Sequence, residues 1–284
     1  MDETTMLSVT NLSVSIDGQP VVSGLDFELK NGERLCLLGA SGSGKSTIAA
    51  ALTGTLAATT RVTGSIDIRG HEVAGVPISR RPPEARAAAI FQDSLSSLNP
   101  LVTVRRQLLQ PFLRRGVRGR AADTAVESLL ARVGIEQPRR LLARYPGELS
   151  GGQRQRICIA VALAGTPGLV VADEPTTALD VVTQARVLDL LRELSDDRRM
   201  TLLLITHDLA VAAKLCERAI VLAGGRAVES APMDELIAAP QHPYTRALID
   251  AASVTVSALH LASQVDPTST SGLPSPGPAR EVSP

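Results

Sequence analysis

Residues 39–46 have the sequence GASGSGKS and match the pattern G-x-x-x-x-G-K-[ST]. The apolar run RLCLLG (34–39) leads into this stretch and predicts a short buried strand, and the run IAAALTGTL that follows it predicts a helix. A glycine-rich turn between a strand and a helix can aim backbone N–H groups at an anion, and the positive end of the helix faces the same anion. The stretch therefore predicts a phosphate-binding loop in an α/β protein, and no other feature limits the fold as strongly.

The residues of this loop have separate expected roles. Its glycines, Gly39, Gly42 and Gly44, let the backbone approach phosphate oxygens closely. Lys45 is expected to reach the β- and γ-phosphates of a nucleotide, and Ser46 to bind Mg²⁺. Thr47 is placed to add a hydroxyl near the α-phosphate.

Two further apolar strands are predicted to end in polar residues. GLVVADEP (168–175) ends in Asp173, where such a strand would deliver a Mg²⁺ ligand, and Glu174, which could orient and deprotonate an attacking water. LLLITHD (202–208) ends in His207, which could hydrogen-bond a γ-phosphate. The alternative for Asp173 and Glu174 is a solvated pair of carboxylates at a strand end, and the alternative for His207 is a structural role.

A second glycine loop lies in LSGGQRQR (149–156). Ser150 is a good helix N-cap, and Gly151 and Gly152 expose backbone N–H groups, so this stretch also predicts an anion-binding helix start. The chain has a single phosphate-loop pattern, and residues 39–47 are already expected to bind the chain's own nucleotide. In a two-fold dimer the second loop would lie over the nucleotide of the partner subunit, and we expect it to act there.

The order of predicted elements indicates one nucleotide domain. Strands are predicted at 7–16 and 21–29 around the turn Asp17-Gly18, and at 64–70, before a helical insertion from about 102 to 144. Alternation of strands and helices then resumes and ends in a strand-like segment at 219–230, which indicates a mostly parallel sheet. The last 19 residues contain 13 Pro, Ser, Gly or Thr and are expected to be disordered.

Composition excludes several other classes. The 284 residues are 44% apolar, which is enough for an α/β domain with a subdomain. The 29 basic and 29 acidic residues give no net charge, and only 2% of residues are aromatic, so nucleic-acid binding is not indicated. The three cysteines are expected to be buried, reduced thiols, and the chain shows neither a signal peptide nor an apolar run of the ~20 residues that a membrane-spanning helix needs.

The ordered motifs GASGSGKST, FQD (91–93), LSGGQ, VVADEP, ALD (178–180) and THD (206–208) resemble those of the ATP-binding-cassette (ABC) ATPases over about residues 6–250. The resemblance implies a P-loop NTPase (RecA-like) fold: a mostly parallel sheet core with an N-terminal antiparallel β region and a helical signature subdomain. It implies an ABC ATPase domain at 1–250, with the core at 1–92 and 161–250 and the helical subdomain at about 93–160. A C-terminal tail follows at 251–284, disordered from about 266. ATP and Mg²⁺ are the implied ligands.

The resemblance also assigns site residues. Gln92 matches the Q-loop residue that senses Mg²⁺ and the γ-phosphate, Asp180 matches the D-loop at the dimer seam, and Ile16 takes the position of an aromatic residue that stacks on adenine. The signature expected to act in trans is Ser150, Gly151, Gly152 and Gln153. The expected catalytic residues are Glu174, His207, Lys45 and Gln92, and the expected Mg²⁺ ligands are Ser46, Gln92 and Asp173. ATP is expected to contact Gly39, Ala40, Ser41, Gly42, Ser43, Gly44, Lys45, Ser46, Thr47, Ile16, Gln92 and Asp173.

Longer stretches resemble one branch of this family, the importer ATPases for dipeptides, oligopeptides and nickel: FQDSLSSLNP (91–100), RYPGELSGGQRQR (144–156), DEPTTALDVVTQARVLDLL (173–191) and HPYTRALIDA (242–251). This resemblance implies a second ATPase subunit, identical or a sister, two transmembrane permeases and an external solute-binding protein, with no direct contact to nucleic acid. The chain would be peripheral at the cytoplasmic face of the membrane. The absence of a Cys-rich segment after HPYT favours the nickel-type members slightly.

Three alternatives remain open at this point. One is a non-transport ABC ATPase acting on nucleic acid or ribosomes, another an exporter subunit, and the third a regulatory nucleotide binder without turnover. The arginine cluster of the helical insertion is interpreted as a solvated helix face or as a contact with a membrane subunit or anionic lipid; it comprises Arg105, Arg106, Arg114, Arg115, Arg118 and Arg120.

Overall fold

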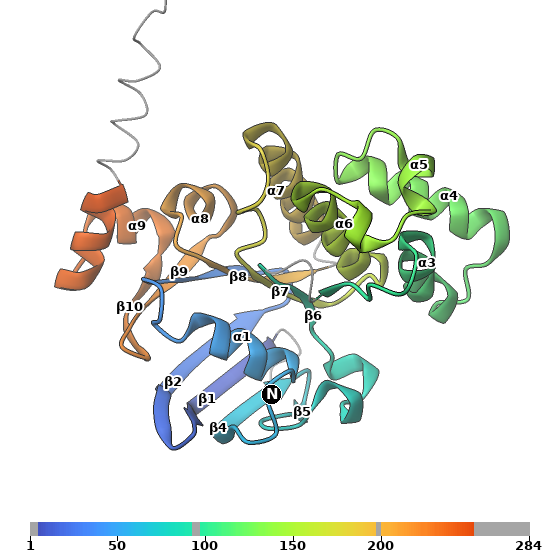
Figure 1. Cartoon of the computed structure of the whole chain (residues 1–284). Helices are drawn as coiled ribbons and strands as arrows, with labels where there is room; N and C mark the ends of the chain where they lie inside the picture. Colours follow the sequence, from blue (N-terminus) through green and yellow to red (C-terminus); the bar gives the residue numbers. More distant parts are fainter. Residues whose placement is uncertain (1–4, 93–96, 197–199, 253–284) are drawn as a thin grey trace, which may run out of the picture.

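Two β-sheets organise the chain in the computed structural model, which describes residues 5–92, 97–196 and 200–252 (Figure 1). The first sheet is antiparallel and has the order β2-β1-β4-β5. The second has the order β10-β9-β3-β8-β7-β6, and all its strands are parallel except β10, which pairs antiparallel with β9. The predicted fold, a mostly parallel core with an N-terminal antiparallel region, is confirmed.

The strands of the antiparallel sheet are β1 (Thr5–Ile16), β2 (Gln19–Lys30), β4 (Arg61–Ile68) and β5 (His71–Glu72). Those of the second sheet are β3 (Arg34–Leu38), β6 (Ala88–Ile90), β7 (Leu169–Asp173), β8 (Thr201–Thr206), β9 (Arg218–Ala223) and β10 (Arg226–Pro232). The helices are α1 (Lys45–Thr53), α3 (Val104–Arg114), α4 (Gly119–Arg132), α5 (Pro138–Leu142), α6 (Gly151–Ala164), α7 (Val181–Asp196), α8 (Leu209–Leu215) and α9 (Met233–Ala238). A further helical segment covers residues 243–252.

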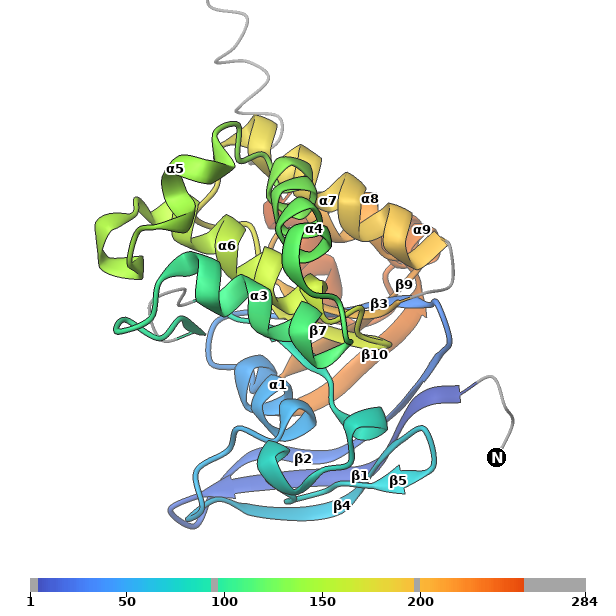
Figure 2. The ribbon, with the colours of Figure 1, turned by 90° about the vertical axis from the view of Figure 1, so that its right-hand side faces the viewer.

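The interior residues of the parallel strands are apolar because both faces of their sheet are covered. In β3, Leu35 and Leu37 join one hydrophobic cluster while Cys36 and Leu38 join the other. The first cluster contains α1 and the antiparallel sheet, and the second contains α3, α4, α6, α7 and α8. Figure 2 shows the same arrangement, with α1 between the two sheets and the other helices on the opposite side. Alternate side chains of one strand therefore hold both layers to the central sheet.

The phosphate-loop helix α1 is fixed at its C-terminal end by a buried arginine. Arg81 is 1% exposed and donates to the carbonyls of Ala51 (2.9 Å) and Val76 (2.8 Å) and also to that of Leu52. The last carbonyls of a helix have no partner within the helix, so the guanidinium supplies one. Burial lowers the pKa of Arg81 to about 10.

The segment expected to be a helical insertion contains α3, α4 and α5. The next helix, α6, runs through residue 160 to Ala164, so the division into a core and a helical subdomain stays a prediction. All six arginines of the cluster predicted here are exposed. Arg105 pairs with Asp123, and Arg115 donates to the carbonyl of Ala164, while a contact with a membrane subunit or lipid stays a hypothesis.

One local prediction differs from the structure, and one strand, β6, was not predicted. The segment 219–230 is a hairpin of β9 and β10, because Gly224 and Gly225 adopt positive φ angles of 56° and 76° and turn the chain back. The three-residue strand β6 has no strong pattern of its own, since its alternation is too short and rich in alanine.

Other predictions concern the cysteines, the membrane and the tail. All three cysteines are buried, as expected. Within the described ranges, no helix has the length and apolar character required to cross a membrane. The tail predicted to be disordered from about residue 266 lies outside the described residues, and so does Asp93 of the FQD motif.

Candidate functional site

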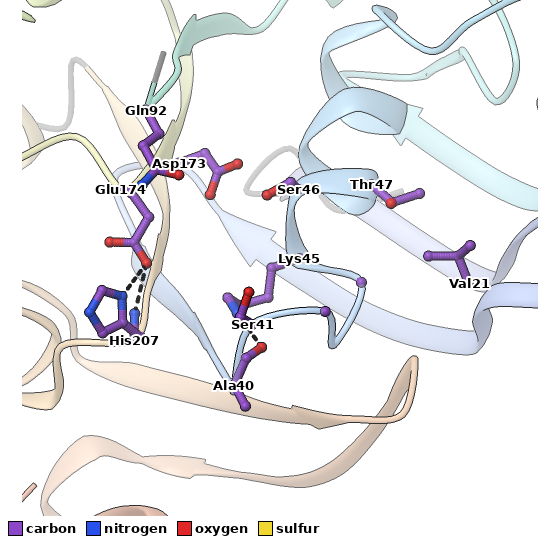
Figure 3. Close-up of a pocket in the computed structure, with 12 residues that line it drawn as sticks. Val21, Ala40, Ser41, Lys45, Ser46, Thr47, Gln92, Asp173, Glu174 and His207 are labelled. Carbon is purple, nitrogen blue, oxygen red and sulfur yellow. Dashed lines mark hydrogen bonds and ion pairs between the residues drawn. The ribbon is translucent and has the colours of Figure 1, made fainter. Parts of the chain in front are cut away.

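A cavity of about 650 Å³ opens at the carboxyl ends of β3, β7 and β8, beside the glycine loop. Ligands of open α/β sheets bind at this edge. Figure 3 shows that the side chains around it come from both sides, the loop before α1 on one and the ends of β6, β7 and β8 on the other. The lining residues are Val21, Ala40, Ser41, Gly42, Gly44, Lys45, Ser46, Thr47, Gln92, Asp173, Glu174 and His207.

The loop can take this shape because two of its glycines meet backbone closely. A Cβ on Gly39 would lie 2.5 Å from the carbonyl oxygen of Leu222 in β9, which leaves no room for a side chain. Gly44 has a φ of 98° and precedes α1, and a Cβ there would be 3.0 Å from the carbonyl oxygen of Val21. These contacts press the loop against β9 and β2 and leave its other side open to the cavity.

Lys45 places its charge inside the loop. Its Nζ atom donates to the carbonyls of Gly39 (2.7 Å) and Ala40 (2.8 Å), and the Oγ atom of Ser43 is 3.4 Å away. Burial lowers the pKa of Lys45, while the carboxylates of Glu174 and Asp173 act in the opposite direction. A bound anion would favour the ammonium form, as expected for a group that binds phosphate.

Asp173 and Ser46 form the oxygen-rich part of the cavity. Asp173 ends β7 and is 6% exposed; its burial raises the pKa of the carboxyl, and a hydrogen bond from Ser46 lowers it. The side chain of Gln92 lines the same cavity. A carboxylate, a hydroxyl and an amide oxygen are the hard ligands that Mg²⁺ prefers, so the three side chains fit this ion.

Glu174 and His207 are in direct contact. The Oε1 atom of Glu174 accepts the backbone N–H of His207 (3.1 Å) and lies 2.6 Å from the Nδ1 atom of its ring (Figure 3). The hydroxyl of Thr177 donates to Oε2 of Glu174 at 3.1 Å. The Glu174 side chain is 13% exposed, against 65% for His207. Both residues were expected at the site, but sequence alone gave no indication of their contact.

The residue expected against adenine does not line this cavity. Ile16 lies at the end of β1 with 38% of its surface exposed, and Val21 of β2 lines the cavity on that side. The β1–β2 register pairs Ile16 with Gln19. Val21 lies two residues further along β2, and its carbonyl approaches Gly44 there. A contact of Ile16 with the base stays a prediction.

The second glycine loop starts α6, as predicted. The Oγ atom of Ser150 accepts the N–H of Gln153 (3.3 Å), and Oε1 of Gln153 accepts the N–H of Ser150 (3.1 Å), which is a capping box. A Cβ on Gly152 would be 3.3 Å from the carbonyl oxygen of Ala178, so this helix start packs on the segment leading to Asp180. None of the four signature residues lines the first cavity; Gln153 and Asp180 line another, of about 480 Å³.

Gln155 links the second loop to the first cavity, and the sequence gave no reason to single it out. It is 1% exposed, and its Nε2 atom donates to the carbonyl of Pro175 (2.8 Å) and, at 3.4 Å, to that of Phe91. Pro175 follows Glu174, and Phe91 precedes Gln92. One buried amide therefore connects the signature helix with the two segments that carry expected catalytic residues.

Comparison with known proteins agrees with this geometry. A family described as "ABC transporter" matches residues 22–177. A putative peptide import ATP-binding protein of Brucella abortus is 41% identical over 254 residues, 87% of this chain and 76% of that protein. The oligopeptide transport ATP-binding protein OppD of Lactococcus lactis is 40% identical over 235 residues, which cover 81% of this chain and 70% of that protein.

Among solved structures, the ATP-binding cassette MJ0796, a dimer bound to ADP and Pi, superposes with a TM-score of 0.69 at 27% identity, covering 80% of this chain and 99% of that one. An ATP-binding subunit of an ABC transporter superposes with a TM-score of 0.72 at 26% identity, and the match covers 89% of this chain and 100% of that one. The family match extends over more than half of the chain, and the close relatives share most of its length. The chain belongs to the ABC transporter family, as an ATP-binding cassette with ATPase activity.

Proposed function

We propose that this chain is an ATPase subunit of an importer that takes up dipeptides or oligopeptides. It works in a pair of ATPase subunits at the cytoplasmic face of the membrane, below two permeases that receive cargo from a solute-binding protein. The relatives named for peptide import support the cargo class. The observation that carries the proposal is the placement of Glu174 and His207 in the same cavity as the phosphate loop.

The chain's own residues divide the work of hydrolysis. The N–H groups of the loop at 39–47 and the ammonium of Lys45 bind the phosphates, and Ser46, Asp173 and Gln92 would hold Mg²⁺. That ion, when bound, neutralises charge on the phosphate oxygens. Glu174 orients the attacking water and accepts its proton.

His207 positions the carboxylate of Glu174 through the 2.6 Å contact and adds a donor for the γ-phosphate. The signature of one subunit, from Ser150 to Gln153, completes the site of the other, and Asp180 lies at the seam between them. The capping box at Ser150 supports this role, because it fixes a helix N-terminus, which favours an anion. Closure on ATP and opening after hydrolysis would move the permeases between two orientations.

The test is uptake by cells that lack the gene for this chain. Radiolabelled tripeptide and ⁶³Ni²⁺ are supplied separately to the deletion strain, and the strain is complemented with the wild-type chain or with Lys45→Ala. Restored tripeptide uptake with the wild-type chain and none with Lys45→Ala is the expected result. Restoration of nickel uptake alone would assign the other cargo of this branch, and uptake unchanged by the deletion would contradict an importer role.

A further inference from the structure

The HPYT stretch at 242–245 reaches the phosphate loop, although it takes no part in the chemistry proposed above. The backbone N–H of Ala40 donates a hydrogen bond of 2.9 Å to the hydroxyl of Tyr244, 204 positions further along the chain. Ala40 is the second residue of the glycine loop and lines the nucleotide cavity. A segment near the C-terminal end of the described chain therefore holds the entry to the loop.

Tyr244 is itself held from two directions. Its ring is half-buried against the hydrophobic cluster that contains α3, α4, α6, α7 and α8. Its backbone N–H donates to Nδ1 of His242 (3.2 Å), at the start of the helical segment 243–252. The hydroxyl is thus attached to an ordered element and is able to restrain what it binds.

The start of that helical segment is tied to β10 by one carboxylate. Glu229 accepts the backbone N–H groups of Gln241 (2.8 Å) and His242 (2.9 Å). Slight burial raises the pKa of Glu229, but these N–H groups and the hydroxyl of Thr245 outweigh it and lower the pKa. Charge-assisted bonds of this kind fix the segment to the sheet that also carries the phosphate loop.

Both backbone groups of Ala40 are engaged by side chains. Its carbonyl accepts Nζ of Lys45 (2.8 Å), and its N–H is bound by Tyr244 (2.9 Å). Among the described residues, those that line the nucleotide cavity include Ala40 and Lys45 but not Tyr244. The hydroxyl therefore supports the loop without occupying the space of the ligand.

We propose that Tyr244 is a positioning residue for the phosphate loop, and that docking of residues 241–252 sets the affinity of the loop for ATP. The inference rests on the proposed function, since it requires residues 39–47 to bind the nucleotide. A glycine-rich loop loses much conformational freedom when it closes on a ligand. Because the hydroxyl fixes the first turn of the loop beforehand, part of that cost is removed from the binding step.

The direct test is Tyr244→Phe in the full chain, which removes the hydroxyl and keeps the ring. Titration with ATP should give a Kd about 2- to 10-fold weaker than wild type, the range of one net hydrogen bond. KM for ATP should rise by the same factor while kcat changes little, and the thermal unfolding midpoint should stay within about 3 °C because the packing is retained.

Tyr145→Phe is the matched control. Tyr145 is the other tyrosine of the chain and is 47% exposed, and its replacement should leave the ATP affinity unchanged. Equal affinity of Tyr244→Phe and wild type would overturn the inference. Tighter binding by Tyr244→Phe would also overturn it, because the hydroxyl would then be competing with phosphate for the Ala40 N–H.

A second variant tests the anchor without touching the tyrosine. Glu229→Gln should weaken ATP binding in the same direction and speed hydrogen exchange at the Ala40 amide. The Ser23 amide, which donates to the carbonyl of Gly225 at 2.9 Å, is the internal reference and should not change. Combined with Tyr244→Phe, Glu229→Gln should add little, since both act on one contact. Failure of the wild-type chain to bind ATP at all would instead contradict the proposed function.

Discussion

The carboxylate of Glu174 and the imidazole of His207 are joined at 2.6 Å between Oε1 and Nδ1, and the backbone N–H of His207 donates to the same oxygen at 3.1 Å. Two adjacent strands, β7 and β8, deliver these residues, and Asp173 pairs with Ile205 in the register between them. The orientation of the proposed base is therefore set by a neighbouring strand.

Glu174→Gln should abolish turnover and preserve nucleotide binding. An amide can hold the same position but cannot accept the proton of the attacking water, so kcat should fall about 10²- to 10⁴-fold. Steady-state phosphate release and ATP titration of the same preparation measure the two effects, and gel filtration with ATP should show a persistent dimer. Glu235→Gln, in the exposed part of α9, should behave as wild type. Substantial remaining hydrolysis would remove Glu174 as the base.

His207→Ala should reduce kcat while ATP affinity changes by less than about 3-fold. The variant keeps the backbone N–H to Glu174 but loses the ring contact, so the carboxylate is less well oriented, and we expect a loss of at least about 10-fold in kcat. His71→Ala, in the exposed strand β5, is the control. A normal kcat for His207→Ala would show that the ring contact has no role in turnover.

Gly151→Asp should prevent ATP-dependent dimerisation without affecting ATP binding by the single chain. The position has room for a side chain, since a Cβ there would be 3.9 Å from the nearest atom, in Arg154. A carboxylate in front of α6 would repel the triphosphate of the partner subunit, and Gly151→Asn has nearly the same shape without the charge. Light scattering with ATP should show at least about 10-fold weaker association for the aspartate variant than for the asparagine variant. Equal association would argue against a signature that acts in trans.

Arg81→Met should destabilise the fold by about 3 kcal/mol or more, because buried carbonyls at the end of α1 lose their donors. Arg80→Met changes the neighbouring exposed arginine and should change the free energy of unfolding by less than about 0.5 kcal/mol. Urea denaturation measures both values. Similar stabilities for the two variants would show that α1 does not depend on this cap.

Glu72→Gln should make stability less dependent on pH. Slight burial raises the pKa of Glu72, but bonds from the Ser65 hydroxyl and the N–H groups of Ala74 (2.8 Å) and Ile66 (3.1 Å) lower it below the ordinary value of 4.5. The stabilisation is therefore present above that value and is lost as pH falls through the folded-state pKa. Because Glu72 is exposed, the difference from wild type should be at most about 1 kcal/mol at neutral pH and should shrink in acid. Urea denaturation across this range measures it, with exposed Glu84→Gln as control; a constant difference would contradict the assignment.

The sequence predicted best what is encoded within a few residues. The glycine loop, the strand before it and the helix after it follow from one short pattern, and Ser150 was identified as an N-cap because Ser before a helix start has a local chemical reason. The turn at Asp17-Gly18 was found for the same reason: both residues adopt positive φ angles, 50° and 78°. Such features depend only on residues that are close to one another in the sequence.

Contacts between distant segments were not predicted. Tyr244 was recognised as part of a family pattern, but nothing in HPYT indicates that its hydroxyl binds Ala40. Arg81 and Gln155 occur in polar surroundings in the sequence, and only the fold shows that each is buried against carbonyls of other segments. Side chains that act through tertiary hydrogen bonds carry no periodic signal, so single-sequence reasoning cannot find them.

The place of β3 at the centre of its sheet has a consequence for synthesis. Its partners are β8 and β9, and Arg34 pairs with Leu202, which is 168 positions later (202 − 34). A nascent polypeptide that ends before residue 201 carries the whole GASGSGKS motif on a strand that lacks both neighbours. Nucleotide binding should therefore begin only after β8 and β9 have been synthesised, and until then the ribosome-attached chain exposes the unpaired apolar strand β3 to chaperones.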